Sequence, residues 1–471
     1  IFAAIPYLIS FLCGLALVRL VLKEHSLSLF LSSVLAAGVG LGISSHLTFL
    51  SFLVFNQLNR LFVIIIHIVI LTVLVLLDFI NRKKQNTPLI NIDKQHLLSL
   101  WPLGFFLLLS IPLWYQSNFY AHGGWDAWST WNLKARFLYY GGEHWRDMFN
   151  PILWRSSPHY PLFLPLINVW GWCFQKSAAL LIPTLTSFIF SLLSVGLLFT
   201  GLKRLTRSYY SLLPAIFLLT LPLFHKLSYS QYSDNVLGFY LLAGLVCLVF
   251  SGTEKNKGFA FLGGLFLGFL SFAKNEGLIA AVLIGGWALI HFLFFTEKNT
   301  RWTLCRHLCI GAIIGGLPTL IFTLFYAPDN ITFINALSSP NAALLPRVKM
   351  IFSFYLVEMT APIWNLLVHT HILKFDILAD PKWRGWWIAL IVILILNWKR
   401  AFDKRTIIIP SFLASYMAIV TFYYFLNVYF EIGWWLQVTL HRILFAILPV
   451  TLFWGFGSVW LDKKDKTGDN S

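Results

Sequence analysis

Long apolar runs, separated by short polar segments, recur along the whole chain. A helix needs about 20 apolar residues to cross the ~30 Å hydrocarbon core of a bilayer, and runs of this order appear from the first residues to Trp460. Hydrophobic residues make up 58% of the 471 positions and charged residues only 11%, so polar surface could not cover a water-soluble core of this composition. The sequence therefore predicts an all-α polytopic membrane protein whose apolar faces are covered by lipid.

The apolar runs predict about 13 transmembrane helices, with interfacial helices in the outer loops. Residues 1–22 are expected to be a span rather than a signal peptide, because no basic segment precedes them and no small-residue cleavage site follows. Residues 160–174 and 351–368 contain or border prolines and polar residues, so they are expected to be interfacial or re-entrant. The predicted spans are residues 1–22, 27–50, 61–80, 97–114, 178–200, 209–224, 235–250, 258–273, 277–295, 304–326, 386–398, 406–425 and 443–460.

Basic residues gather in short segments between the apolar runs. The formal net charge is +16, and under the predicted span list six basic segments fall on one side of the membrane. This is the positive-inside pattern, which assigns that side to the cytoplasm and argues against nucleic acid as a partner. The segments are Arg82 to Lys84, Lys203 to Arg207, Lys255 to Lys257, Lys298 to Arg301, Lys399 to Arg405, and Lys463 with Lys464.

The opposite, outer face collects most of the residues capable of chemistry. Asp126 follows a glycine pair and lies between Trp125 and Trp128, close after a predicted span. A carboxylate at the membrane boundary suits a base that acts on a lipid-linked substrate. A helix N-cap is the alternative interpretation of the same residue. Trp128, Trp131, Ala135 and Leu138 have helical spacing and are expected to form a stripe in the membrane interface.

Three later outer segments carry charged residues. Asp234 begins a span, where a helix N-cap is again the alternative. Lys274 and Glu276 lie in a polar break between two spans, either as a turn that faces water or as a functional pair at membrane depth. Arg442, beside His441, marks the outer start of the last predicted span, where an arginine that only snorkels toward the interface is the alternative.

The segment from Ser156 to Leu166 is rich in proline and aromatic residues and predicts an irregular approach to a membrane segment. It holds His159 and Tyr160 and follows Arg155, which are candidates for substrate contact. A rigid loop without a substrate role is the alternative.

No metal site is predicted. His369 and His371 are two positions apart and would point to different faces of a helix. The five cysteines are scattered, so neither a zinc site nor a disulfide framework is indicated.

The order of these motifs resembles the GT-C superfamily, membrane glycosyltransferases that use polyprenyl-phosphate sugars. Protein O-mannosyltransferases and the aminoarabinose transferases of lipid A are examples. The resemblance covers residues 97–295 and includes Asp126 after a span, the Tyr160-Pro161-Leu162 segment, Asp234, and the Lys274 to Gly277 break. His441 and Arg442 resemble a late arginine motif of bacterial members. The chain departs from the family at Trp125-Asp126-Ala127, where members usually have paired acids, and at Tyr160-Pro161, where they have Pro-Pro.

The resemblance implies a sugar transfer on the outer face of a bacterial cytoplasmic membrane. Asp126 would be the catalytic base, and the expected substrate-binding residues are Asp234, Lys274, Glu276, Arg442, Arg155, His159 and Tyr160. The partners would be a lipid-linked sugar donor, membrane lipids, and an acceptor glycan, lipid or protein, with no cofactor beyond the donor. The chain would divide into three segments: N-terminal transmembrane helices at 1–96, a catalytic module at 97–326, and the long outer region with the C-terminal helices at 327–471.

Two other functional classes remain open at this point. A transporter or flippase of lipid-linked sugars would distribute polar residues along a path and often show repeated halves, whereas here they concentrate on one face. A surface-polysaccharide polymerase or ligase would depend on a large late outer loop, and residues 328–384 are long enough for one. A purely structural membrane protein would leave the acids at the membrane boundary unexplained.

Overall fold

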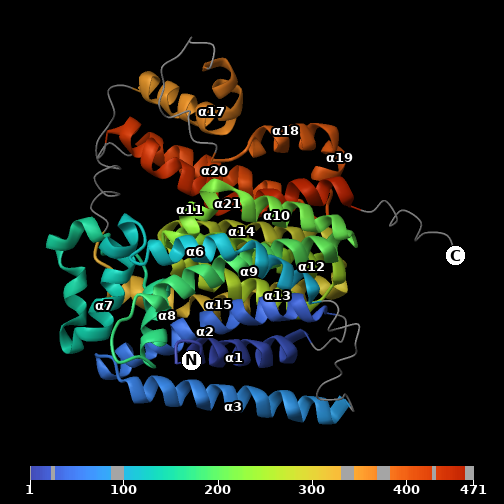
Figure 1. Cartoon of the computed structure of the whole chain (residues 1–471). Helices are drawn as coiled ribbons and strands as arrows, with labels where there is room; N and C mark the ends of the chain where they lie inside the picture. Colours follow the sequence, from blue (N-terminus) through green and yellow to red (C-terminus); the bar gives the residue numbers. More distant parts are fainter. Residues whose placement is uncertain are drawn as a thin grey trace.

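The computed structural model describes residues 2–22, 27–85, 100–329, 344–368, 382–426 and 431–461. All regular secondary structure in these ranges is helical, and the long helices lie side by side in one bundle (Figure 1). α3 runs along one edge of this bundle and α17 to α20 lie along the opposite edge. The chain is therefore a multi-pass all-α membrane protein by helix length and hydropathy.

Nine helices of the described residues are long and apolar enough to cross a membrane. They are α1 (Ile5–Leu22), α2 (Leu29–Phe55), α3 (Arg60–Gln85), α9 (Leu181–Thr206), α12 (Ser233–Glu254), α14 (Asn275–Phe295), α15 (Lys298–Phe325), α20 (Ile408–Leu426) and α21 (Ile432–Trp460). A tenth span is possible where two helical segments meet at an angle of 62°. These segments are Tyr209–Thr220, which contains α10 (Leu212–Thr220), and α11 (Pro222–Tyr229).

The 13 crossings expected from the sequence are not confirmed, because three predicted runs form short or broken helices. The run at 97–114 contains α5 (Trp101–Leu109) and then α6 (Ile111–Phe119), with Pro112 in the first turn of α6. α13 (Lys257–Ala273) has 17 residues and α18 (Trp386–Leu396) has 11. A helix of 11 residues is only about 16 Å long, roughly half of the hydrocarbon core.

Close packing fixes the position of α13 within the bundle. A Cβ atom built on Gly264 would lie 2.1 Å from the carbonyl oxygen of Leu308 in α15, and one built on Gly268 would lie 2.2 Å from the carbonyl carbon of Gly315. Only glycine permits this approach of two backbones, as in other membrane helix pairs. The end of α13, which leads to Lys274, is therefore held firmly against its neighbour.

The two ends of α12 define two chemically different ends of the bundle. At its last turn, Glu254 forms an ion pair of 2.7 Å with Arg204 at the end of α9. The next residue, Lys255, pairs at 2.5 Å with Glu297, which follows α14. Two of the basic segments that were expected to share one side of the membrane, those with Arg204 and Lys255, thus lie at the same end.

Short helices occupy the opposite end, where Figure 1 shows α7 lying beyond the bundle. They are η1 (Ala127–Trp131), α7 (Asn132–Tyr140), η2 (Gly142–Phe149), η3 (Pro151–Ser156) and α8 (Phe163–Trp172). With ten residues, α8 is too short to cross a ~30 Å core. Residues 351–368 belong to one continuous helix, α17 (Leu344–Val368).

The aromatic stripe expected in the membrane interface instead packs inside the protein. Trp131, Ala135 and Leu138 have no exposed surface, and only Trp128 is exposed. Ala135 and Leu138 belong to α7, which contacts α8, a helix that is itself buried along its whole length. Helical spacing identified the apolar face correctly, but protein rather than lipid covers it.

Candidate functional site

Five charged side chains form a chain of ion pairs at the end of the bundle that holds the short helices. Asp126 pairs with Arg442 at 2.7 Å, and Arg442 pairs with Asp234 at 2.6 Å. Asp234 also pairs with Lys274 at 3.1 Å, and Lys274 pairs with Glu276 at 3.1 Å. We call these five residues the charged cluster. The structure thus brings together candidates that lie in four segments between positions 126 and 442.

Asp234 is the centre of the charged cluster. It is the second residue of α12, and its side chain is 2% exposed. One carboxylate oxygen accepts a hydrogen bond from Lys274 Nζ, and the other accepts from Nε and Nη2 of Arg442. The N-cap interpretation is wrong, because Tyr232 holds the cap position and both oxygens of Asp234 bind cations. A buried carboxylate with two cationic partners is an electrostatic anchor.

Lys274 links Asp234 to Glu276 from the break between α13 and α14. Its backbone is extended, which ends α13 and begins α14 at the next residue. The residue is 6% exposed, so the expectation of a turn that faces water is wrong. Burial alone would lower the pKa of Lys274, but the carboxylates of Asp234 and Glu276 outweigh it and raise this pKa above its ordinary value. The ammonium group is therefore charged.

Arg442 lies well inside the last helix. α21 begins at Ile432, whereas the sequence suggested a start at residue 443. The guanidinium carbon lies 4.6 Å from the ring centroid of Tyr232, in addition to its pairing with two carboxylates. An arginine that only snorkels does not account for these contacts, because the guanidinium group pairs with two carboxylates of the protein.

Asp126 is the last residue before the π-helical turn η1, and its side chain is 26% exposed. It makes no side-chain cap hydrogen bond, so the N-cap interpretation is also wrong here. Gly123 has a φ of +71°, which favours glycine, and the Gly124 N–H donates to the carbonyl of Ser230 at 2.9 Å. This contact docks the Asp126 loop on the turn that precedes α12. Single π-helical turns occur often at functional sites.

Glu276 is the second carboxylate of the charged cluster that reaches the surface, with 27% of its side chain exposed. One oxygen pairs with Lys274 Nζ, while Oε2 is buried and has no hydrogen-bond partner among the described residues. Buried carboxylate oxygens are usually satisfied, so this atom is available to a donor that the protein itself does not supply.

Tyr160 covers the Lys274 side of the charged cluster. The Lys274 ammonium lies 5.7 Å from its ring centroid, and the ring stacks on Trp131 at 5.5 Å. The His159 ring lies 4.9 Å from that of Tyr160. Burial, with a smaller effect of the Lys134 charge, lowers the pKa of His159 to about 4, so its imidazole is neutral at pH 7.

Arg155 is not part of this arrangement. It is an exposed residue of η3, and its guanidinium carbon lies 5.1 Å from the ring centroid of Trp154. In the described part of the chain, no three His, Cys, Asp or Glu side chains are placed to hold a metal ion. His369 and His371 lie outside the described residues.

Lys134 is the residue that the sequence interpretation missed. Its side chain is fully buried in α7, and Nζ donates to the carbonyl oxygens of Ser157 and Tyr160 at 2.8 Å and of Pro158 at 3.4 Å. Burial lowers the pKa of Lys134. The signal was present, because Lys134 lies one position before Ala135 on the apolar stripe, where a lysine needs buried partners.

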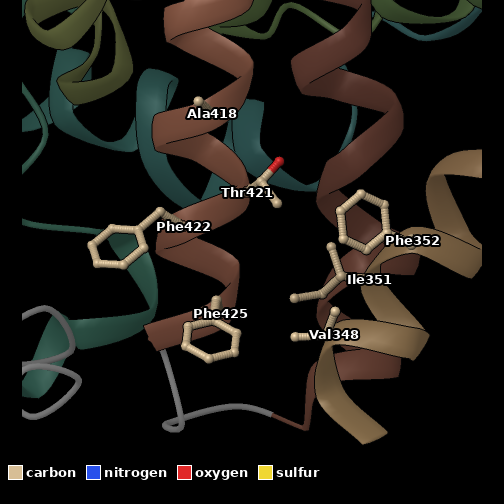
Figure 2. Close-up of a pocket in the computed structure, with 7 residues that line it drawn as sticks. All are labelled: Val348, Ile351, Phe352, Ala418, Thr421, Phe422 and Phe425. Carbon is tan, nitrogen blue, oxygen red and sulfur yellow. The ribbon is translucent and has the colours of Figure 1, made fainter. Parts of the chain in front are cut away.

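One cavity lies apart from the charged cluster. Its volume is about 260 Å³, and it lies between α17 and α20. In Figure 2, Val348 and Ile351 of α17 lie opposite Phe425 of α20. A smaller cavity, of about 40 Å³, borders His122 and Trp128. Neither of these two cavities is lined by a member of the charged cluster.

Comparison with known proteins assigns no family. No family model matches the sequence, and neither a curated protein nor a solved structure matches it. The chain is thus established as a multi-pass all-α membrane protein, and its activity has to be inferred from the charged cluster.

Proposed function

We propose that this protein is a membrane glycosyltransferase of the GT-C type, which moves a sugar from a polyprenyl-phosphate donor to an acceptor. The observation that carries the proposal is the pairing of two partly exposed carboxylates, Asp126 and Glu276, with two cations held by the buried Asp234. Such a group supplies both a proton acceptor and positive charge within a few ångströms, as transfer of a sugar from a phosphate leaving group to an acceptor hydroxyl requires.

The location of the charged cluster fits a lipid-linked substrate. Asp234 lies in the first turn of α12, whereas the basic residues Arg204 and Lys255 lie near the last turn. The positive-inside rule assigns the basic end to the cytoplasm, so the charged cluster would face the outer side. There, a polyprenyl tail would remain between helices while its sugar phosphate reaches the cluster.

The proposed reaction assigns a role to each charged group. The acceptor oxygen forms a bond to the anomeric carbon, and the bond from that carbon to the phosphate oxygen breaks, leaving its electron pair on the phosphate. The acceptor proton passes to Asp126. The donor phosphodiester carries one negative charge and the released polyprenyl phosphate carries up to two, so Arg442 and Lys274 stabilise the charge that develops.

The remaining candidates would contact the sugar or the acceptor. Glu276 offers a buried, unpartnered oxygen to a sugar hydroxyl, and the neutral imidazole of His159 can donate one hydrogen bond and accept another. Tyr160 would limit the space above Lys274. Arg155 is exposed near this end, where an acceptor would approach.

Transport of a lipid-linked sugar is the second candidate, favoured by charges buried within the bundle, since ionisable residues at membrane depth often mark a translocation path. Asp234 and Glu276 instead lie at the same end of the bundle, each in the first turn of its helix. This location favours a reaction at one face of the membrane over a path through it. A polymerase or ligase would draw on residues 328–384, of which 330–343 and 369–381 lie outside the described residues.

One reconstitution experiment separates these functions. The purified protein would be placed in vesicles with radiolabelled polyprenyl-phosphate sugars and an acceptor extract. We expect the label to move covalently to the acceptor. Movement of intact labelled lipid across the bilayer, without a new glycosidic bond, would assign the protein to the transporters and contradict the proposed transfer.

A further inference from the structure

Arg442 is bound by two acids that differ sharply in exposure. The side chain of Asp234 is 2% exposed, whereas that of Asp126 is 26% exposed. Both approach the same nitrogen, Nη2, at 2.6 Å and 2.7 Å. One partner is therefore part of the interior, while the other meets the guanidinium group from the accessible side.

The guanidinium group would stay in place without Asp126. Asp234 accepts hydrogen bonds from both Nε and Nη2 of Arg442, at 3.1 Å and 2.6 Å. The ring of Tyr232 also covers the guanidinium group, at 4.6 Å from its carbon atom. Because these contacts fix the cation, departure of Asp126 would expose a preorganised, positively charged edge.

The balance of charge implies that an anion must displace one of the acids. Three carboxylates surround two cations, which leaves the charged cluster with one net negative charge and disfavours the addition of a phosphate. Asp126 is the acid that can leave, because it lies at the start of the short helical segment that continues into the π-helical turn, outside the long helices. Glu276 instead belongs to the first turn of α14 and has a buried oxygen.

We propose that Arg442 forms a phosphate site that Asp126 closes in the free protein, and that the phosphate of a lipid substrate displaces Asp126 when it binds. This inference rests on the proposed function and adds the order in which the donor binds and the base is released. Donor binding would release the carboxylate that then accepts the acceptor proton. The base would thus be free only when a donor is present.

The test measures binding, without turnover. The probe is farnesyl phosphate, with farnesol as the control for insertion of the apolar tail into detergent or protein. Asp126→Asn removes the competing charge and preserves the shape of the side chain. The matched control is Asp147→Asn, which removes a charge from η2. The side chain of Asp147 is 64% exposed and pairs with His144 rather than with the charged cluster.

We expect Asp126→Asn to bind farnesyl phosphate about 2- to 5-fold more tightly than the unmodified protein, the range that loss of one partly exposed ion pair corresponds to. Asp147→Asn should bind as the unmodified protein does, and farnesol should not distinguish the three. Equal or weaker binding by Asp126→Asn, or no preference for farnesyl phosphate over farnesol, would overturn the displacement.

The outcome is separable from that of the proposed reaction. Tighter binding by Asp126→Asn in a protein that transfers no sugar would leave the phosphate site standing and remove the glycosyltransferase proposal. If the unmodified protein transfers sugar but Asp126→Asn leaves the affinity for farnesyl phosphate unchanged, the glycosyltransferase proposal stands and the displacement of Asp126 is removed.

Discussion

Lys134 and Tyr160 are joined by a hydrogen bond of 2.8 Å, from the lysine ammonium to the tyrosine backbone carbonyl. The same ammonium donates to two more carbonyls of the preceding loop. Because Lys134 lies in the helix that follows the Asp126 turn, it connects the two polypeptide segments that flank the charged cluster. We therefore regard Lys134 as a positioning residue rather than a catalytic one.

Lys134→Met should destabilise the protein while preserving most of the side-chain volume. The change leaves the carbonyls of Ser157, Pro158 and Tyr160 without their buried donor, at a cost of roughly 2–5 kcal/mol in the free energy of unfolding. Thermal unfolding in detergent measures the effect. Lys176→Met, at an exposed position, is the control and should leave Tm unchanged. An unchanged Tm for Lys134→Met would show that water or other groups satisfy the loop.

Asp234→Asn should be more damaging to the fold than any other single change in the charged cluster. It removes the buried charge that Arg442 and Lys274 share, leaving two cations close together with only partly exposed partners. Loss of one partner from a buried ion pair costs about 3–5 kcal/mol. Urea or thermal unfolding should show this loss of stability, with Asp147→Asn as a surface control. A normal unfolding transition for Asp234→Asn would contradict its role as the anchor.

The fold class followed from the sequence because long apolar runs have few solutions in a bilayer. The number of spans did not, because hydropathy does not show where a helix is interrupted. Residues 97–114 form one apolar run, yet the helices change near Pro112. The short α18 likewise has the composition of a span without its length.

The members of the charged cluster could each be found from the sequence, but their pairing could not. Asp234 and Arg442 are 208 positions apart, and no local pattern connects them. At Asp126 and Asp234 a helix cap was a plausible local use of an acid. In the structure Asp126 makes no cap hydrogen bond, Tyr232 holds the cap position of α12, and both acids pair with Arg442 instead. Lys134 stands out on the predicted apolar stripe, but its partners could not be predicted, because backbone carbonyls have no sequence signature.

The pKa of His159 predicts a loss of stability in mild acid. Burial holds this pKa at about 4 in the folded protein, against an ordinary value of about 6.5. Between these values the unfolded chain binds a proton that the folded protein does not, so stability falls as the pH drops from about 6.5 to 4. Comparing Tm at pH 7 and pH 5 for the unmodified protein and His159→Gln should show a smaller decrease in the variant. Equal decreases would assign the acid sensitivity to other groups.

Membrane orientation predicts opposite labelling at the two ends of the bundle. Trp125 is exposed near the charged cluster and Lys255 is exposed at the basic end. In a background without native cysteines, Trp125→Cys should react with an impermeant maleimide added to intact cells, and Lys255→Cys should react only after the membrane is opened. Labelling of Lys255→Cys in intact cells would reverse the orientation and place the charged cluster in the cytoplasm.

Asp126→Asn should separate catalysis from structure at the charged cluster. Asparagine keeps the shape of the side chain and can still accept a hydrogen bond from Arg442, and the lost ion pair is partly exposed, so stability should fall by about 1 kcal/mol or less. The amide cannot take the acceptor proton, so the rate of sugar transfer should fall by about 100- to 10,000-fold. Tm and turnover would be measured on the same preparation, with Asp147→Asn expected to match the unmodified protein in both. A folded Asp126→Asn protein that retains most of its turnover would exclude Asp126 as the base and leave Glu276, the other partly exposed carboxylate of the charged cluster, as the next residue to test.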